Sequence, residues 1–264
     1  MLGSMLVILT WAYPRKNRSK HGRILLLWLS IADLLSSCVY FIQTFHRQGK
    51  SICEISSLLG IFFPVASFLW TDCIAFFLYL VVSNRTCYQP YNWDKLLRNF
   101  HIFVWTLSIL TIILVFSFGH AGYASDDDGN DGAADNTGGW CWITADSPTE
   151  RFIWEIIGGK FIEWTSCLII LPYLYTSVYF QLAQPRLTST NSYTSSSHSR
   201  FFNKFYIKLA AVPIILICIR LWSSIRIILQ FARPHKNNAD SFFEVMQAFF
   251  DPSQGIFNAL IFVF

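Results

Sequence analysis

The sequence predicts an all-α membrane protein, a bundle of seven transmembrane helices whose N-terminus lies outside the cell. Apolar stretches of membrane-spanning length and loops of alternating charge lead to this prediction. Hydrophobic residues make up 53% of the chain and charged residues only 14%, against about 25% charged residues in a typical soluble domain. A bilayer core takes about 20 apolar residues to cross as a helix. The expected helices are residues 1–13, 24–45, 53–83, 95–118, 152–180, 203–231 and 242–264, within one domain of residues 1–264.

The charge of the loops sets the orientation of the helices, because basic segments resist translocation across a membrane. The loops after the first, third and fifth helices carry eleven Lys and Arg residues, and the other three loops carry five. The fourth loop is strongly acidic, with aspartates gathered in Asp126–Asp135. The basic side is therefore cytoplasmic, which places the N-terminus outside and the C-terminus inside. The net charge of +4 reflects this asymmetry, so nucleic acid is not an expected partner.

The first apolar stretch is short. At 1.5 Å per residue, Met1–Tyr13 spans about 20 Å, less than the hydrocarbon core of about 30 Å. Phe264 ends within an apolar run that no basic cluster follows. We therefore expect the first helix to be truncated and the N-terminus and the cytoplasmic tail to be missing. The alternative is a six-helix protein with a short interfacial segment at its N-terminus.

The positions of the cysteines predict one disulfide. Cysteine residues within the apolar helices or the cytoplasmic loops stay reduced. Only Cys53 and Cys141 fall on the outer, oxidising side of the predicted topology. A bridge between them closes a loop of about 90 residues, which is worth several kcal/mol in the chain-entropy model. It pins the fourth loop across the mouth of the bundle.

Four charged residues lie deep in the predicted helices, where each is costly unless it is paired or hydrated. Asp33 and Asp72 lie about 16 Å from the cytoplasmic ends of their helices by helical rise, so they could face one another. Arg220 and Asp251 lie at comparable depth on the sixth and seventh helices and form a candidate ion pair. These residues are a candidate polar switch core, and the alternative is a static, satisfied network.

Other polar and aromatic residues lie nearer the outer surface and are candidates for the wall of a ligand pocket. Two tryptophans flank the predicted disulfide and could cap such a pocket. The charged members could instead extend their side chains to the membrane interface. The candidates are Glu54, Trp140, Trp142, Lys160, Glu163, Arg226 and Glu244.

Four strings carry a resemblance to a known family. They are Gly139–Ile143 (GWCWI), Leu29–Leu35 (LSIADLL), Ile219–Arg226 (IRLWSSIR) and Ser253–Leu260 (SQGIFNAL). Together they resemble the cyclic-AMP-receptor-like class of G-protein-coupled receptors, and within it the orphan animal branch, the G-protein-coupled receptor 157 family. The resemblance covers essentially the whole chain.

Two departures separate the chain from the larger rhodopsin-like class. The third helix ends Val81–Arg85 (VVSNR) and lacks the acidic-Arg-aromatic triplet of that class, and residues 242–264 lack its Asn-Pro-x-x-Tyr signature. Activation switches of the rhodopsin-like class are therefore not carried over to this chain.

The resemblance implies a plasma-membrane receptor that transmits an extracellular ligand signal to a heterotrimeric G protein. The basic cytoplasmic face suggests a G-protein contact around Arg85, Tyr179 and Lys204. The ligand is not implied, because the acidic fourth loop would repel an anionic nucleotide. The alternative function is a transporter or channel that uses the intramembrane charges, although no internal repeat of the kind common in transporters is evident.

The sequence gives no sign of an enzyme. No HExxH pattern, GxSxG elbow or phosphate-binding glycine loop is present, and these are the motifs that would point to zinc, acyl-transfer or nucleotide chemistry. We therefore expect no cofactor and no metal site.

Overall fold

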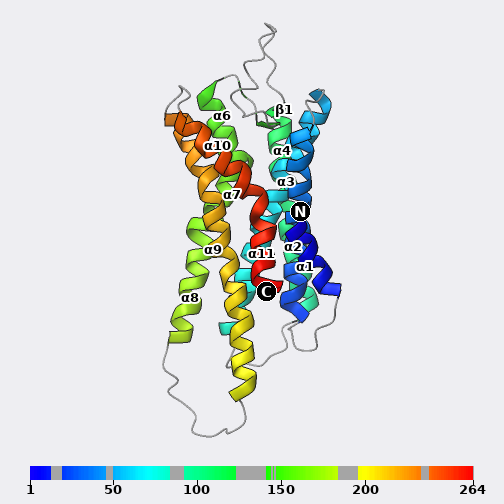
Figure 1. The fold of residues 1–264 in the computed structure, drawn as a ribbon, viewed down its shortest axis with the longest axis vertical. Coiled ribbons are helices and arrows are strands. Elements are labelled where there is room, and N and C mark those ends of the chain that lie inside the picture. The colour runs from blue at the N-terminus through cyan, green and yellow to red at the C-terminus, as the bar shows by residue number, and fades with distance from the viewer. Residues whose placement is uncertain are drawn as a thin grey trace.

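A computed structural model of the chain describes residues 1–12, 20–45, 50–83, 92–122, 141–143, 145, 147–183, 196–232 and 238–263. These residues form a bundle of seven helical spans along one axis (Figure 1). The first four spans and the sixth are α1 (Leu2–Ala12), α2 (Lys20–Phe45), α3 (Lys50–Ser83), α4 (Trp93–Ser117) and α9 (Ser196–Ala232). The fifth comprises α6 (Pro148–Glu155), η2 (Ile156–Lys160), α7 (Phe161–Thr165), η3 (Ser166–Ile170) and α8 (Leu171–Ala183). The seventh comprises α10 (Asn238–Phe250), η4 (Asp251–Ser253) and α11 (Gln254–Val263).

Within the described residues, five helices are long and apolar enough by themselves to cross a membrane. They are His21–Gln43, Ser51–Val82, Trp93–Ser117, Thr149–Phe180 and Ala211–Leu229. The first span is short, and the seventh is divided by η4, so neither meets that length alone. Both belong to the bundle through packing, because α1 lies against α11 and α2. The predicted all-α membrane bundle is confirmed.

Several spans start before the predicted residues, and capping explains one of these differences. The fifth span begins at Pro148 rather than residue 152, because the Ser147 side chain accepts a hydrogen bond from Glu150 N and Pro148 occupies the first turn. A serine cap followed by proline is a favoured helix start. The sixth span begins at Ser196 rather than residue 203, and the seventh at Asn238 rather than residue 242.

Two spans depart from a regular α-helix. In the fifth, η2 and η3 are π-helical, and Gly159 has φ +158° and ψ −31°, a conformation that residues with a side chain rarely adopt. The seventh span, predicted as one helix over 242–264, changes to a 3₁₀ turn at Asp251–Ser253. Proline lacks a backbone N–H and disfavours the helical conformation of the residue before it, so Pro252 accounts for this break.

Helix α3 is the central helix of the bundle. It packs against α2, α4, α8 and α9, and 72% of its most apolar 18-residue window is buried, against 28% for α4. Trp70, Leu69 and Ile74 of α3 are fully or almost fully buried. Large apolar side chains on the outer faces are instead exposed, among them Ile113, Leu168 and Leu260. This arrangement suits a bundle whose surroundings are lipid.

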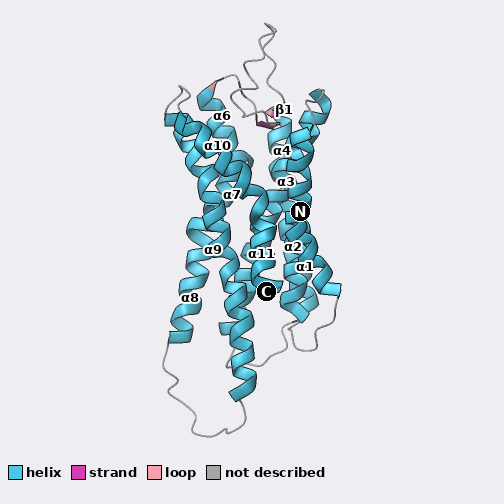
Figure 2. Ribbon diagram, viewed as in Figure 1, coloured by secondary structure: helices cyan, strands magenta, loops and turns pink. Residues whose placement is uncertain are grey.

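A short hairpin lies at one end of the bundle. Strand β1 (Ala121–Gly122) pairs antiparallel with β2 (Trp142–Ile143). Figures 1 and 2 show it at the same end as α6 and α10, the upper end in these views. The predicted topology makes this the outer end.

Candidate functional site

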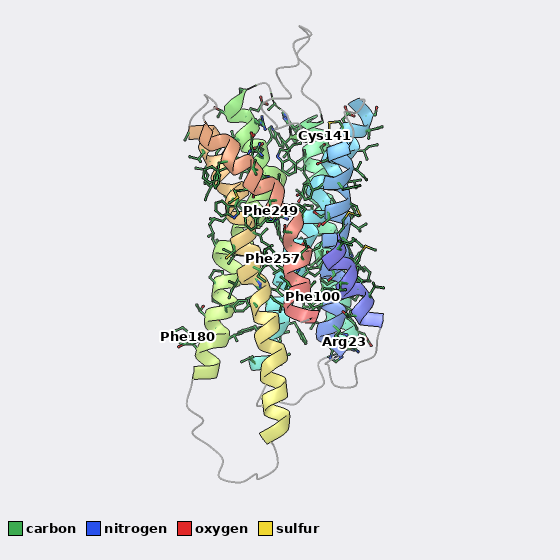
Figure 3. The ribbon with its side chains drawn as sticks, viewed as in Figure 1. Arg23, Phe100, Cys141, Phe180, Phe249 and Phe257 are labelled. Atoms are coloured by element: carbon green, nitrogen blue, oxygen red, sulfur yellow. A yellow bond between two sulfur atoms is a disulfide. The ribbon has the colours of Figure 1, made fainter. Side chains whose placement is uncertain are left out.

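A disulfide attaches the hairpin to the central helix. Cys53 in the first turns of α3 is bonded to Cys141, and their Cα atoms lie 5.2 Å apart. Gln43 of α2 strengthens the attachment, because its Nε2 donates to the carbonyl oxygens of Ser56 (3.0 Å) and Cys141 (3.2 Å). Figure 3 shows Cys141 at the outer end of the bundle, opposite Arg23 and Phe180. The bridge thus fixes Trp142, the next residue, over the helices.

Below the hairpin lies a cavity enclosed by all but the first and fourth spans. Its walls come from α2, α3, the fifth span, α9, α10 and η4, with Trp142 from β2. Five of the seven predicted pocket residues line it: Trp142, Lys160, Glu163, Arg226 and Glu244. Arg220 and Asp251, predicted as members of a switch core, line the same cavity.

Arg220 of α9 and Asp251 of η4 form an ion pair, with 3.2 Å between Nη1 and Oδ1. Both side chains are buried. Arg220 also donates a hydrogen bond to the Tyr40 hydroxyl, and its guanidinium carbon lies 4.8 Å from the centroid of the Phe68 ring. A buried charge needs such partners, and a cation over an aromatic face adds to them. The pair therefore joins the sixth span to the break in the seventh.

A second buried cluster joins the fifth span to the sixth. Lys160 Nζ donates to both carboxylate oxygens of Glu163, each at 2.9 Å, and to Ser223 Oγ at 2.6 Å. An ammonium has three donors, so Lys160 is fully satisfied. Ser224 Oγ donates to Glu163 Oε1 (3.1 Å) and accepts from Trp164 Nε1 (2.9 Å). The cluster thus holds residues 160–164 of the fifth span against residues 223–224 of α9.

Asp33 lies at the centre of a third polar cluster, in the middle of the bundle. Its two oxygens accept from Ser67 of α3 (2.6 Å) and from Asn258 of α11 (2.9 Å). Gln254 Nε2 donates to Ser67 Oγ at 3.0 Å, and Ser37 bonds the carbonyls of Asp33 and Pro252. The cluster holds α11 against α2 and α3.

Asp72 does not face Asp33, contrary to the expectation from their equal depths. Its Oδ1 accepts from Ser166 Oγ of η3 at 2.6 Å, so it binds the fifth span and not the second. Ser67, which contacts Asp33, precedes Asp72 by five residues on α3. Five residues turn an α-helix by about 140° beyond a full turn, so the two side chains point to different neighbours.

The remaining predicted residues lie elsewhere. Glu54 stands in the first turns of α3 and is half-buried, but it does not line the cavity. Trp140 and Arg85 fall outside the described residues, and so does the side chain of Lys204 in α9. Tyr179 of α8 is 69% exposed. The structure therefore brings Trp142 together with the charged cavity residues, while the predicted cytoplasmic group stays a prediction because only the Tyr179 side chain of the three is described.

Sequence reasoning missed several polar residues of the cavity wall. Arg151 and Glu155 form an ion pair of 3.2 Å on α6, and their i, i+4 spacing was a signal that could have found them. Tyr40, Gln43 and Gln247 also line the cavity. These three are uncharged and fall within otherwise apolar helices, so nothing in the pattern marked them.

Every charged residue that lines the cavity lies within 4.0 Å of an opposite charge. Within the described residues no group of three or more His, Cys, Asp or Glu could hold a metal ion. Buried pairs at helix contacts have two arrangements, closed and broken, so they are suited to couple a bound ligand to helix positions.

The comparisons agree with this architecture. Residues 3–251 match the family described as 7 transmembrane receptor (rhodopsin family). Among its relatives, the chain is 33% identical over 244 residues to G-protein coupled receptor 157 of Mus musculus, covering 86% of this chain and 67% of the relative. It is 32% identical over 238 residues to the Homo sapiens receptor of the same name, covering 86% and 66%. Cyclic AMP receptor-like protein A of Dictyostelium discoideum is 25% identical over 152 residues, covering 58% of this chain and 35% of the relative.

The chain therefore belongs to the seven-transmembrane receptor family. It is a multi-pass membrane protein of a receptor family, and its resemblance to G-protein coupled receptor 157 and to cyclic-AMP-receptor-like proteins is confirmed. The two departures from rhodopsin-like motifs, at Val81–Arg85 and in residues 242–264, remain features of this sequence within the family. The chain spans about two thirds of the length of the mouse and human relatives.

Proposed function

We propose that this protein is a plasma-membrane receptor that converts the binding of an extracellular ligand into activation of a heterotrimeric G protein. The observation that carries the proposal is the cavity beneath the disulfide-bonded hairpin, whose wall includes the Arg220–Asp251 pair. A ligand in this cavity would touch the contact that joins the sixth span to the seventh. Membership of a receptor family supports the same proposal over a transporter or channel.

The signal passes from the cavity to the cytoplasmic side through the polar clusters. Asp251 is the first residue of η4, and the carbonyl oxygen of the next residue, Pro252, accepts a hydrogen bond from Ser37 Oγ. Ser37 in turn bonds the Asp33 carbonyl, in the cluster that holds α11 to α2 and α3. A ligand that changes the Arg220–Asp251 distance therefore biases the positions of α9 and α11. In this scheme Asp33, Asp72, Arg220 and Asp251 act as a polar switch core, and Trp140, outside the described residues, stays a predicted residue of the pocket wall.

G-protein activation is tested by nucleotide exchange. The full-length receptor and its Asp251→Asn variant are placed in lipid vesicles with each main class of heterotrimeric G protein, and the rate of GTP binding is measured. The variant breaks the pair without a ligand, so we expect it to accelerate exchange at least threefold over the unsubstituted receptor with one class. Exchange at the rate of empty vesicles for both proteins, with every class, contradicts the proposal.

The cytoplasmic contact is tested in the same assay. Arg85, Tyr179 and Lys204 lie near the cytoplasmic ends of spans three, five and six by the predicted topology. Charge reversal by Arg85→Glu and Lys204→Glu in the Asp251→Asn background should remove most of the exchange activity at equal receptor amount. Lys236→Glu, in a loop that the topology places outside, is the matched control. If the two cytoplasmic reversals behave like the control, this contact is wrong.

A further inference from the structure

The charges around the cavity balance one another. Its wall holds four cations and four anions, so its net charge is zero with ordinary ionisation. Each cation has a carboxylate within the 4.0 Å that defines an ion pair. A ligand with a net charge would leave one charge in the site uncompensated, which is costly among buried groups. The four pairs are Arg151–Glu155, Lys160–Glu163, Arg220–Asp251 and Arg226–Glu244.

Three of these pairs are closed. Their nitrogen–oxygen distances are 3.2 Å in Arg151–Glu155, 2.9 Å in Lys160–Glu163 and 3.2 Å in Arg220–Asp251. The donors of Lys160 are all used. Arg220 Nε and Asp251 Oδ1 have no hydrogen-bond partner among the described residues, but the Arg220 guanidinium is already held against Asp251 and over Phe68. A ligand therefore gains less from these three pairs than from a pair whose charges stand further apart.

The fourth pair is open. Arg226 Nη2 lies 3.9 Å from Glu244 Oε1, beyond hydrogen-bond distance. Arg226 Nη1 donates to Gln247 Oε1 at 2.8 Å, but its Nε has no hydrogen-bond partner among the described residues. Arg226 is nonetheless only 9% exposed. A buried guanidinium with a free donor beside a carboxylate it does not reach is a site for a ligand that carries both charges.

The opposite wall of the cavity is apolar. Ile61, Val65 and Phe68 of α3 line it and are buried, and Trp142 covers it from the hairpin. Apolar walls with a few placed charges are typical of sites for small molecules. A ligand that matches both walls carries a zwitterionic head and an apolar side chain.

We infer that the cavity binds a small zwitterion of the amino-acid or short-peptide class, with its carboxylate on Arg226, its ammonium on Glu244 and its side chain against α3. The guanidinium of an arginine can donate two parallel hydrogen bonds to one carboxylate, a bidentate geometry that a lysine cannot reproduce. The inference rests on the proposed receptor function, because it names the ligand class for the same cavity.

Binding is tested with matched probes on the purified full-length receptor in detergent, by the ligand-dependent shift in its thermal unfolding temperature. L-phenylalanine and glycyl-L-phenylalanine carry both charges, 2-phenylethylamine carries only the cation, and 3-phenylpropionate only the anion. We expect a dissociation constant for at least one zwitterion that is ten times lower than that for either singly charged probe. Equal binding of all probes, or binding of none up to 10 mM (about the weakest useful affinity), overturns the inference.

Two variants assign the head group. Arg226→Gln and Glu244→Gln should each weaken zwitterion binding at least tenfold, while Arg98→Gln on the exposed face of α4 should leave it unchanged. If Arg226→Gln does not fold, Arg226→Lys keeps the charge and loses the fork, and we expect a loss of at least threefold. Unchanged affinity in the Arg226 and Glu244 variants refutes the assignment. A receptor that accelerates GTP exchange but binds no zwitterion refutes this inference and leaves the proposed function intact.

Discussion

Arg220 combines burial with a charge that it cannot lose, since a guanidinium stays protonated in proteins. A charge at the centre of a membrane helix costs about 3 kcal/mol even on insertion scales. Asp251, Tyr40 and Phe68 compensate this cost. Removing one partner of a buried pair costs more than the pair itself contributes, because the other charge is left uncompensated.

Breaking the Arg220–Asp251 pair should destabilise the receptor and raise its basal signalling. We expect Arg220→Gln and Asp251→Asn each to lower the unfolding free energy by about 3 kcal/mol, measured by thermal unfolding, and to raise ligand-independent second-messenger output. The exchanged variant Arg220→Asp/Asp251→Arg should restore part of the unfolding free energy and bring basal signalling part of the way back down. If it is no better than the worse single variant, the two residues do not act as a pair.

The Lys160–Glu163 cluster should couple the fifth span to the sixth. Glu163→Gln removes the charge that faces Lys160, and Ser223→Ala removes its third acceptor. We expect a loss of stability of about 3 kcal/mol for the first and about 1 kcal/mol for the second. The double variant should lose less than the sum, because both changes act on one ammonium. Additive losses in thermal unfolding would show that the contacts are independent.

Residue depth could be predicted from the sequence, but rotation about the helix axis could not. Counting residues placed Arg220 and Asp251 at one level, and their spans are consecutive, so they meet. The same count placed Asp33 and Asp72 at one level, yet they bind different helices. Each residue turns an α-helix by about 100°, so an error of one or two residues in the predicted register changes the neighbour that a side chain faces. Glu54 lies off the cavity, because the part of α3 that lines it begins six residues later, at Gly60.

At the scale of elements, small residues set how closely the first and last spans approach. Gly3 of α1 lies against the backbone of Gly255 and Ile256 in α11, and Gly255 lies against Ser4. Small residues at such crossings let helix backbones pack directly in membrane proteins. The short α1 therefore keeps its place through packing rather than through its own length.

Gly3→Ala should push α1 away from α11. The added methyl would overlap backbone atoms, which cannot rotate out of the way, so we expect a loss of about 1–3 kcal/mol in thermal unfolding. Gly60→Ala in α3 is the matched control, because its methyl would meet side-chain atoms and no backbone, with Gln43 Nε2 nearest at 3.3 Å and Val39 and Trp142 at 3.8 and 4.0 Å. A Gly3→Ala variant as stable as Gly60→Ala would contradict the close contact.

The presence of each helical span could be predicted from the sequence, but the places where a span departs from a regular α-helix could not. The apolar stretches predict each span because length and hydropathy are properties of the chain. The π-helical segments of the fifth span depend on partners far along the sequence, since Ser166 of η3 bonds Asp72. The break in the seventh span is caused by Pro252. The prediction of one helix over 242–264 considered only the apolar residues and did not take this proline into account.

At the scale of the whole molecule, the polar groups form a path along the bundle axis. The cavity lies under the hairpin, the Arg220–Asp251 pair lines it, and the Asp33 cluster follows. Figure 3 labels Phe249 and Phe257, which lie before and after η4 in the seventh span, with Phe249 nearer the outer end. Asp33, Arg220 and Asp251 each contact a polar partner inside the bundle and are buried, so none of these charges faces lipid.

We expect the disulfide to contribute more to the stability of the outer end of the bundle than any other single interaction there. Cys53 and Cys141 are separated by 88 residues, and closing such a loop is worth about 4–5 kcal/mol in the chain-entropy model. The gain in a membrane protein is smaller, since helices inserted in the bilayer stay formed when the bundle opens. We therefore expect the Cys53→Ser/Cys141→Ser variant to lose about 2–4 kcal/mol in thermal unfolding.

The same variant should lose ligand binding before it loses its helices. The bridge is the covalent attachment that holds Trp142 over the cavity, so releasing it loosens one wall of the site and leaves α2, α3 and α9 packed below. We expect helix content by circular dichroism to remain unchanged, while probe binding to the cavity falls at least tenfold. Cys218→Ser, at an exposed free cysteine of α9, should change neither property. Probe binding that survives the loss of the bridge would mean that the hairpin does not form part of the site.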